Sequence, residues 1–247
     1  MHLILLPAFL RLMKAFHSSL RFLIVRKLKY SNKDAIQHIL SGRVLVNGQR
    51  GTLDQELLPE DEVRVDGQVI KESKHNVYLA YHKPRGIEST LNLQIENNLS
   101  QAINISRSVF PVGRLDKESE GLMLLTDDGG LLYKILHAER RQEKEYLVTV
   151  DHPLTQQAIK CLADGIVIMG KKTRPSFVRQ LDATTFNIIL TQGLNRQIRR
   201  MCYKLGYQVI KLVRVRILSL ELGNLPLGEW RHLNESEITH LAEMTTD

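Results

Sequence analysis

Residues 111–123 read PVGRLDKESEGLM and place a polar, partly basic turn between two apolar runs. The runs are Val109–Val112 before the turn and Leu122–Leu125 after it, and both have the composition of short buried segments. Because both flanking runs are expected to be buried, the turn between them is expected to be held in place. The sequence therefore predicts a preorganised carboxylate at Asp116.

Three further blocks follow along the chain: KEYLVTV at 144–150, QGLNRQIRRM at 192–201 and LPLGEWR at 225–231. Together with GRLDKESEGL at 113–122, they closely resemble the motifs of the RsuA/RluB/RluE/RluF family of bacterial rRNA pseudouridine synthases. Within that family they look most like the large-subunit synthase F branch. Four motifs in the right order over residues 77 to 240 are far more specific than a single GRLD.

The resemblance implies an enzyme that converts one uridine of an RNA to pseudouridine. In this reaction the bond from N1 of uracil to C1′ of ribose breaks, the base rotates, and C5 takes the place of N1. The enzyme must extract the base from its stack and hold it beside a carboxylate. The motif Asp is catalytic in the family, and here it is Asp116. Covalent attack and removal of a ribose proton are both compatible with this residue.

Two further residues complete the catalytic site that the resemblance implies. The family uses the Tyr of the KEY block to stack on the flipped base, which requires only an aromatic face. The Arg of the Gln-Ile-Arg triplet pairs with the catalytic Asp and would hold it ionised. On a helical wheel over Asn195–Leu205, Arg199 falls between the apolar and the basic side. The predicted catalytic residues are Asp116, Tyr146 and Arg199.

Seven further basic residues are predicted to face RNA. Arg114 matches the family residue that occupies the space left by the extracted base, and Arg196 and Arg200 lie on the basic side of the predicted helix. Lys83 belongs to a Lys-Pro-x-Gly block, which we interpret first as a rigid turn and second as an RNA contact. The predicted RNA contacts are Arg114, Lys117, Lys83, Arg196, Arg200, Lys33 and Arg43.

The N-terminal part of the chain predicts a small separate module. Ser31 can cap a helix with Asp34 at its third position, and the apolar stripe of this helix ends before Gly42. Strands with Asn-Gly and Asp-Gly turns follow within residues 43–48 and 63–70. A helix running into GRVLVNG resembles the S4-type RNA-binding domain of these synthases, but Asn32 stands where the family usually has Arg.

We expect an extension of unknown role at 1–19, an S4-type domain at 20–70, a linker at 71–76 and a catalytic domain at 77–247. Residues 1–30 contain no Asp or Glu. A dispensable extension and an organellar transit peptide both fit this composition, and the first apolar run is too short for a membrane span. The interleaved strands and helices of the catalytic domain predict an α+β fold on a mixed, largely antiparallel sheet.

The overall composition suits a polyanionic partner. The net charge is +7 and the isoelectric point is about 9.4, and each Lys or Arg near a phosphate releases condensed counterions. Cys161 and Cys202 show neither a disulfide framework nor metal-ligand spacing, so we interpret them as reduced core thiols. We expect no metal, no cofactor and no membrane contact. The expected protein is a cytoplasmic monomer that binds RNA, foremost a 23S rRNA stem-loop.

Three alternatives stay open at the level of sequence. A tRNA anticodon stem-loop or 16S rRNA would support the same reaction. An S4 protein that binds rRNA without modifying it would be expected to have lost the Asp, Tyr or Arg of the site, and this chain has all three. A carboxylate-dependent hydrolase or phosphotransferase would use Asp127 and Asp128. This pair is followed by Gly-Gly and fits a turn and helix start better.

Overall fold

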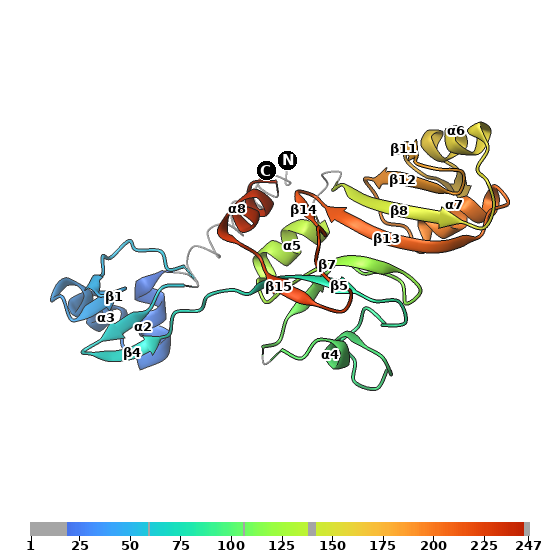
Figure 1. The fold of residues 1–247 in the computed structure, drawn as a ribbon. Coiled ribbons are helices and arrows are strands. Elements are labelled where there is room, and N and C mark those ends of the chain that lie inside the picture. The colour runs from blue at the N-terminus through green and yellow to red at the C-terminus, as the bar shows by residue number, and fades with distance from the viewer. Residues whose placement is uncertain (1–18, 59, 106, 138–141, 245–247) are drawn as a thin grey trace, which may run out of the picture. The chain divides into compact units, whose positions relative to one another are not determined.

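The computed structural model describes residues 19–58, 60–105, 107–137 and 142–244. The expected extension at 1–19 lies outside the described residues except for its last position, Ser19. By its internal contacts the chain divides into two compact units, Met1–Asn76 and Val77–Asp247. Figure 1 labels most of the elements of both. Among the described residues, no helix has the length and hydropathy needed to span a membrane.

The first unit packs two helices with a four-stranded antiparallel sheet. Its elements are α2 (Leu20–Leu28), α3 (Asn32–Leu40), β1 (Val44–Val46), β2 (Gln49–Arg50), β3 (Val63–Val65) and β4 (Gln68–Lys71). The strands lie in the order β2-β1-β3-β4, and the core joins Leu20 and Ile24 of α2 to the valines of β1 and β3. β4 includes Lys71, which we had placed in the linker.

Local sequence signals govern the first unit. Ser31 Oγ accepts a hydrogen bond from Asp34 N at 3.1 Å, and the Asp34 carboxylate accepts one from Ser31 N at 3.3 Å, so the predicted capping box is confirmed. Both residues of the Asn47–Gly48 turn and of the Asp66–Gly67 turn have positive φ, between 52° and 81°. Two consecutive positive φ angles define the type I′ turn that joins tight hairpins.

The second unit is built on one nine-stranded sheet. Its elements in chain order are β5 (Tyr78–Lys83), α4 (Leu99–Ala102), β6 (Phe110–Val112), β7 (Glu120–Thr126), α5 (Gly129–His137), β8 (Lys144–Val150), α6 (Gln156–Asp164), β9 (Val167–Ile168), β10 (Lys171–Lys172), β11 (Phe177–Gln180), β12 (Thr185–Leu190), α7 (Gln197–Lys204), β13 (Val209–Ile217), β14 (Leu220–Glu221), β15 (Trp230–His232) and α8 (Glu235–Glu243). The small β9–β10 hairpin stands outside the sheet.

The sheet has the order β11-β12-β8-β13-β7-β5-β15, with β14 paired to β13 and β6 paired to β7. Only the β13–β7 pair is parallel, and all the others are antiparallel. The predicted α+β fold on a mixed, largely antiparallel sheet is confirmed. The apolar runs on either side of the GRLD turn become β6 and β7, which pair with each other.

Helices cover the sheet so that β7 is buried on both faces. Leu122 and Leu124 pack with α5 and α8, whereas Met123 and Leu125 pack with α4. Successive side chains of a strand point to opposite faces, so this alternation explains the uninterrupted apolar run. The other half of the sheet, made by β8, β12 and β13, is covered by α6 and α7 (Figure 1). The strand that follows the GRLD turn is therefore firmly anchored.

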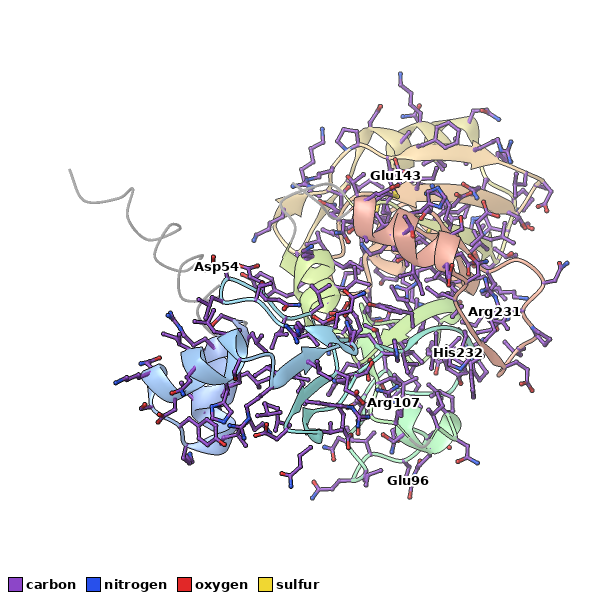
Figure 2. All side chains as sticks on the ribbon, turned by 90° about the vertical axis from the view of Figure 1, so that its left-hand side faces the viewer. Asp54, Glu96, Arg107, Glu143, Arg231 and His232 are labelled. Carbon is purple, nitrogen blue, oxygen red and sulfur yellow. The ribbon has the colours of Figure 1, made fainter. Side chains whose placement is uncertain are left out.

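The last helix is tied to the edge of the sheet by an ion pair. Arg231 of β15, labelled in Figure 2, donates two hydrogen bonds to the Glu237 carboxylate of α8, at 2.7 and 2.8 Å. Bidentate pairing of this kind fixes orientation as well as distance. It holds α8 in place while Leu241 fills the core beneath it.

β7 and β13 approach each other at Gly121 more closely than a side chain would allow. Gly121 pairs with Arg214, and a Cβ at this position would lie 2.4 Å from both N and O of the Arg214 backbone. The φ angle of Gly121 is 114°, a conformation that other residues rarely adopt. Both the steric limit and the backbone angle require glycine here.

We predict that Gly121→Ala lowers the free energy of unfolding by more than about 3 kcal/mol, because it adds a backbone clash to the strain of positive φ. Gly206→Ala is the control: its φ is 88°, but no atom lies within 4 Å of the added Cβ. The control should lose only about 1–2 kcal/mol. Urea denaturation of both variants measures the difference, and equal losses would show that the close approach does not matter.

Candidate active site

A cleft of about 800 Å³ lies beside the loop that joins β6 to β7. The loop contributes Arg114, Asp116 and Lys117 to its lining, β8 contributes Tyr146, and β13 contributes Arg214. The structure thus brings together two of the three predicted catalytic residues, Asp116 and Tyr146, from positions 30 apart in sequence. The third, Arg199, reaches the same loop from α7.

The main chain of the loop is held at every carbonyl from residue 114 to residue 118. The donors are Arg214 Nη1 to Arg114 O (3.3 Å), Ser89 Oγ to Leu115 O (2.6 Å), Ser119 N to Asp116 O (3.0 Å), Gly86 N to Lys117 O (2.8 Å) and Arg199 Nη2 to Glu118 O (2.7 Å). Ser89 Oγ also accepts from Leu115 N at 3.1 Å. These bonds fix the loop without any contribution from a substrate.

The carboxylate of Asp116, by contrast, is not engaged. It is half-buried, lines the cleft, and forms no hydrogen bond or ion pair with any residue that the structure describes. The backbone is rigidly held while the acidic group stays unpaired. This combination leaves the carboxylate oriented and available to a bound molecule.

The expected ion pair between Arg199 and Asp116 is not formed: within the described part of the chain, no carboxylate lies within 4.0 Å of the Arg199 guanidinium. Its Nη2 atom instead bonds Glu118 O and, at 3.3 Å, Ser119 Oγ, and its Nη1 atom bonds Val209 O at 3.1 Å. Burial lowers the pKa of Arg199, and the charge of Arg196 adds to this shift while that of Asp116 opposes it. Arg199 therefore acts on the main chain of the loop.

Arg214 is a site residue that sequence reasoning missed. Its side chain is 1% exposed, its Nε donates to Leu122 O at 2.7 Å, and it faces Tyr146 across the β13–β8 pair. Burial lowers the pKa of this guanidinium, and the Tyr146 phenol opposes the shift. Its Nη2 is buried with no partner among the described residues. A basic residue within the apolar run from Leu212 to Val215 was the available signal.

The prediction that Lys83 contacts RNA is wrong. Its side chain is fully buried, and Nζ donates to Pro84 O at 2.8 Å and to Ile87 O at 2.7 Å. The ammonium thus satisfies two carbonyls of the turn whose Gly86 N bonds the catalytic loop. Burial lowers the pKa of Lys83 to about 8, although the charge of Glu88 opposes the shift.

The other predicted RNA contacts of the second unit lie at the surface of the cleft or next to it. Arg114, Lys117 and Arg196 are exposed and line the cleft. Arg200 lies outside it and donates to Asn195 O at 3.1 Å and to Asn195 Oδ1 at 3.2 Å. The predicted helix at 195–205 begins only at Gln197, because Arg196 adopts a left-handed backbone conformation, with φ 50° and ψ 36°.

In the first unit, Lys33 and Arg43 are both exposed. The Arg43 guanidinium is bound to the Asp66 carboxylate by two hydrogen bonds of 2.5 and 2.7 Å. This ion pair joins residues 23 apart in sequence and occupies the face that a phosphate would use. Of the two cations, Lys33 is the more accessible to a phosphate, because it has no such carboxylate partner among the described residues.

The acidic pair that suggested metal chemistry has a structural role. Asp127 Oδ1 accepts a hydrogen bond from Val77 N at 2.7 Å, and Asp128 Oδ1 accepts from Gly130 N and Leu131 N at the start of α5. The interpretation as a turn and helix start is confirmed. Across the described residues, no group of three or more His, Cys, Asp or Glu side chains is arranged to hold a metal ion.

Residues 77–204 match the family described as RNA pseudouridylate synthase. The chain belongs to the RNA pseudouridine synthase family. This synthase is 44% identical over 216 residues to the dual-specificity RNA pseudouridine synthase RluF of Escherichia coli K12. The aligned residues make up 87% of this chain and 74% of RluF. It is 31% identical to the ribosomal large subunit pseudouridine synthase B of Bacillus subtilis 168, over 85% and 90% of the two chains.

A crystal structure of a pseudouridylate synthase aligns with the chain at a TM-score of 0.63 and 28% identity, over 90% of this chain and 99% of that one. The family assignment drawn from the four sequence motifs is confirmed. The synthase is an isomerase that converts uridine to pseudouridine in RNA.

We predict that Arg199→Ala lowers kcat by about 10²-fold or more, because it frees the Glu118 carbonyl and allows the loop to shift, and small misplacements of a reacting group are this costly. Arg200→Ala is the matched variant from the next position of α7. Since Arg200 bonds Asn195 and not the loop, its loss should raise KM with little change in kcat. Steady-state kinetics separates the two, and equal changes in KM alone would assign both arginines to RNA binding.

We also predict a pH-dependent stability term from Lys83. The pKa in the folded state, about 8, lies below the unfolded value of 10.5, so the folded state binds fewer protons and the cost of the buried charge falls as pH rises through this window. The free energy of unfolding of the wild type should rise relative to Lys83→Met by about 1–2 kcal/mol between pH 7.5 and 9.5. Parallel curves in urea denaturation would contradict this.

Proposed function

We propose that the enzyme modifies one uridine in a stem-loop of 23S rRNA, with Asp116 as its catalytic carboxylate. The observation that carries this proposal is the unpaired Asp116 carboxylate in the cleft, on a loop held at five consecutive carbonyls. The names of two relatives, one a dual-specificity RNA enzyme and one a ribosomal large subunit enzyme, support this class of substrate.

The cleft provides what the isomerisation requires. The target base leaves its stack, enters the cleft and lies against the ring of Tyr146, which needs no hydrogen bonds to accept it. Asp116 then assists breakage of the bond from N1 to C1′. After the base rotates, C5 bonds to C1′ and loses its proton, and N1 gains one. Atoms and electrons balance without a cofactor, and we propose that none is used.

The two arginines of the site position the reacting groups. Arg199 holds the loop at Glu118 and Ser119, and Arg214 holds it at Arg114. Arg214 and Tyr146 both line the cleft, and the buried Nη2 of Arg214 has no partner among the described residues, so we propose that it donates to an oxygen of the flipped nucleotide. A buried donor left unpaired costs about 1–3 kcal/mol, and a substrate oxygen would relieve that cost.

The surrounding basic residues bind the RNA backbone. We propose that Arg114 occupies the space left by the extracted base, and that Lys117, Arg196 and Arg200 meet phosphates. We propose further that residues 20–70 form an S4-type module which adds affinity through Lys33. Arg43 contributes only where its pair with Asp66 opens. We propose that the enzyme acts as a monomer, and the bacterial relatives support a cytoplasmic location.

The test of this function uses unmodified RNA that carries tritium at C5 of uridine, because each turnover releases one tritium. Three substrates are compared: a 23S rRNA, a 16S rRNA and a tRNA. We expect release from the 23S rRNA with one pseudouridine mapped per molecule. Tritium release from the tRNA alone or from the 16S rRNA alone would show that this RNA, and not the 23S rRNA, is the substrate. No release from any of the three RNAs would overturn the proposal.

We predict that Asp116→Asn lowers tritium release by more than about 10³-fold, since the amide cannot act as nucleophile or base. RNA affinity should stay near that of the wild type, because the loop is held through its main chain and not through this side chain. Asp164→Asn, at an exposed position at the end of α6, is the control and should keep full activity. Substantial turnover by Asp116→Asn would assign the chemistry elsewhere.

A further inference from the structure

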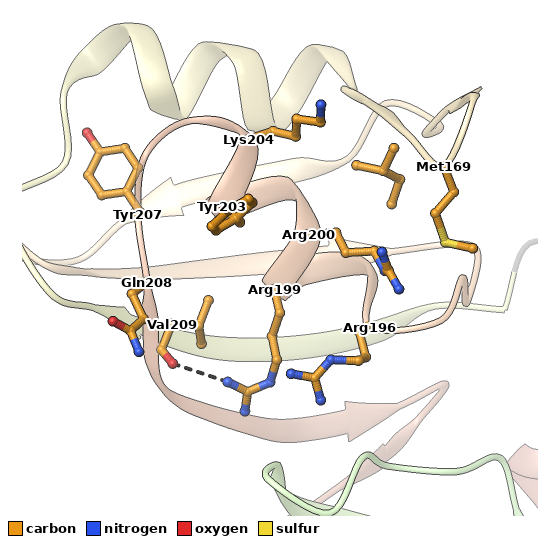
Figure 3. Close-up of a pocket in the computed structure, with 10 residues that line it drawn as sticks. Met169, Arg196, Arg199, Arg200, Tyr203, Lys204, Tyr207, Gln208 and Val209 are labelled. Carbon is orange, nitrogen blue, oxygen red and sulfur yellow. Dashed lines mark hydrogen bonds between the residues drawn. The ribbon is translucent and has the colours of Figure 1, made fainter.

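A second hollow of about 500 Å³ lies beside α7, and Figure 3 shows the residues that line it. Its walls come from the β9–β10 hairpin, from α7 and from the start of β13. Of the ten residues that line this hollow, only Arg196 lines the catalytic cleft as well. Its volume lies within the range of about 300–1,000 Å³ that is typical of small-molecule sites. A single nucleotide matches such a space, and a duplex does not.

The charge of this hollow is positive and largely uncompensated. Four of its ten lining residues are cationic, Arg196, Arg199, Arg200 and Lys204, and none is acidic. Arg199 and Arg200 are engaged with main-chain oxygens. The side chains of Arg196 and Lys204 are exposed and form no hydrogen bond or ion pair with the part of the chain that the structure describes. They are free to meet a phosphate.

The same hollow offers an aromatic and apolar platform. Tyr203 is 79% exposed and Met169 is 64% exposed, and both lie on its rim (Figure 3). Deeper in, the ring of Tyr207 is buried and stacks on His152 at 4.4 Å between ring centroids, while its hydroxyl accepts from Thr155 N. Rigid and exposed rings beside unpaired cations are how proteins bind single-stranded nucleic acid without reading its sequence.

Arg196 stands between the two hollows in a strained conformation. Its left-handed backbone is unfavourable for a residue with a side chain, and it begins α7 without a side-chain cap. Strain of this kind is retained where a side chain has to be held in a particular place. Here it places one guanidinium at the wall common to the cleft and the second hollow.

We infer that the hollow binds one unpaired nucleotide of the substrate strand, close to the target uridine, with its base on Tyr203 and Met169 and its phosphate at Arg196 and Lys204. This subsite rests on the proposed function, because it takes its nucleotide from the RNA whose uridine occupies the cleft. It explains why uncompensated charge and exposed aromatic surface coincide on one helix.

The test is a double-mutant cycle between the protein and the RNA. The variant Tyr203→Ala/Lys204→Gln removes the exposed part of the hollow. Its matched control is Tyr133→Ala/Lys134→Gln, which removes the same dipeptide from an exposed face of α5. A stem-loop RNA is prepared with each unpaired nucleotide around the target uridine replaced in turn by an abasic one, and Kd is measured for every combination.

We expect one abasic position to weaken binding by the wild type and by the control by about 5- to 100-fold. The Tyr203/Lys204 variant should bind intact RNA more weakly than the wild type does, and the abasic substitution at that position should not raise its Kd further. If no position couples to Tyr203, or if the variant weakens all RNAs alike, the subsite is overturned and the charge acts only at long range. Tritium release by the wild type distinguishes this failure from that of the proposed function, since the reaction persists without the subsite.

Discussion

The rest of the site depends on the hydrogen bonds that hold the main chain of residues 114–118. A net contribution of about 0.5–1.5 kcal/mol for each bond gives the loop several kcal/mol of restraint. The donors come from the turn after β5, from the loop itself, from α7 and from β13. The side chain of Asp116 takes no part, so the structure restrains the backbone of the catalytic residue and leaves its carboxylate to the substrate. Such preorganisation avoids reorganisation at the moment of reaction.

The fold serves this restraint. β7 is buried on both faces, which fixes the C-terminal end of the loop. Gly121 allows β13 to approach β7 closely at Arg214, and the Arg214 side chain bonds the loop at Arg114 O. Burying a guanidinium costs several kcal/mol unless its donors are satisfied. Arg214 recovers part of that cost through the carbonyls of Leu122 and Arg114. Its Nη2 has no partner among the described residues, and we propose that a substrate oxygen in the cleft accepts its hydrogen bond.

Local features were predictable from the sequence, and long-range ones were not. The capping box at Ser31, the Asn-Gly and Asp-Gly turns, the buried run after the GRLD turn and the family itself follow from short patterns. Lys83 was assigned to RNA because the sequence does not show that a lysine is buried. Arg214 was missed because its partner Arg114 is 100 residues away. Arg199 bonds the Glu118 carbonyl and not the Asp116 carboxylate. Which of these two groups lies within hydrogen-bond distance depends on how α7 packs beside the loop, and the sequence does not show this.

The most direct test of the central claim is a crystal structure of the synthase bound to a stem-loop RNA with 5-fluorouridine at the target, since fluorine at C5 cannot leave as a proton. The account predicts that the five hydrogen bonds to carbonyls 114–118 are unchanged from the free protein. The base should lie on the ring of Tyr146, with the Asp116 carboxylate about 3–3.5 Å from the reacting sugar or base atom. A loop that exchanges these partners on binding, or a base placed away from Asp116, would contradict it.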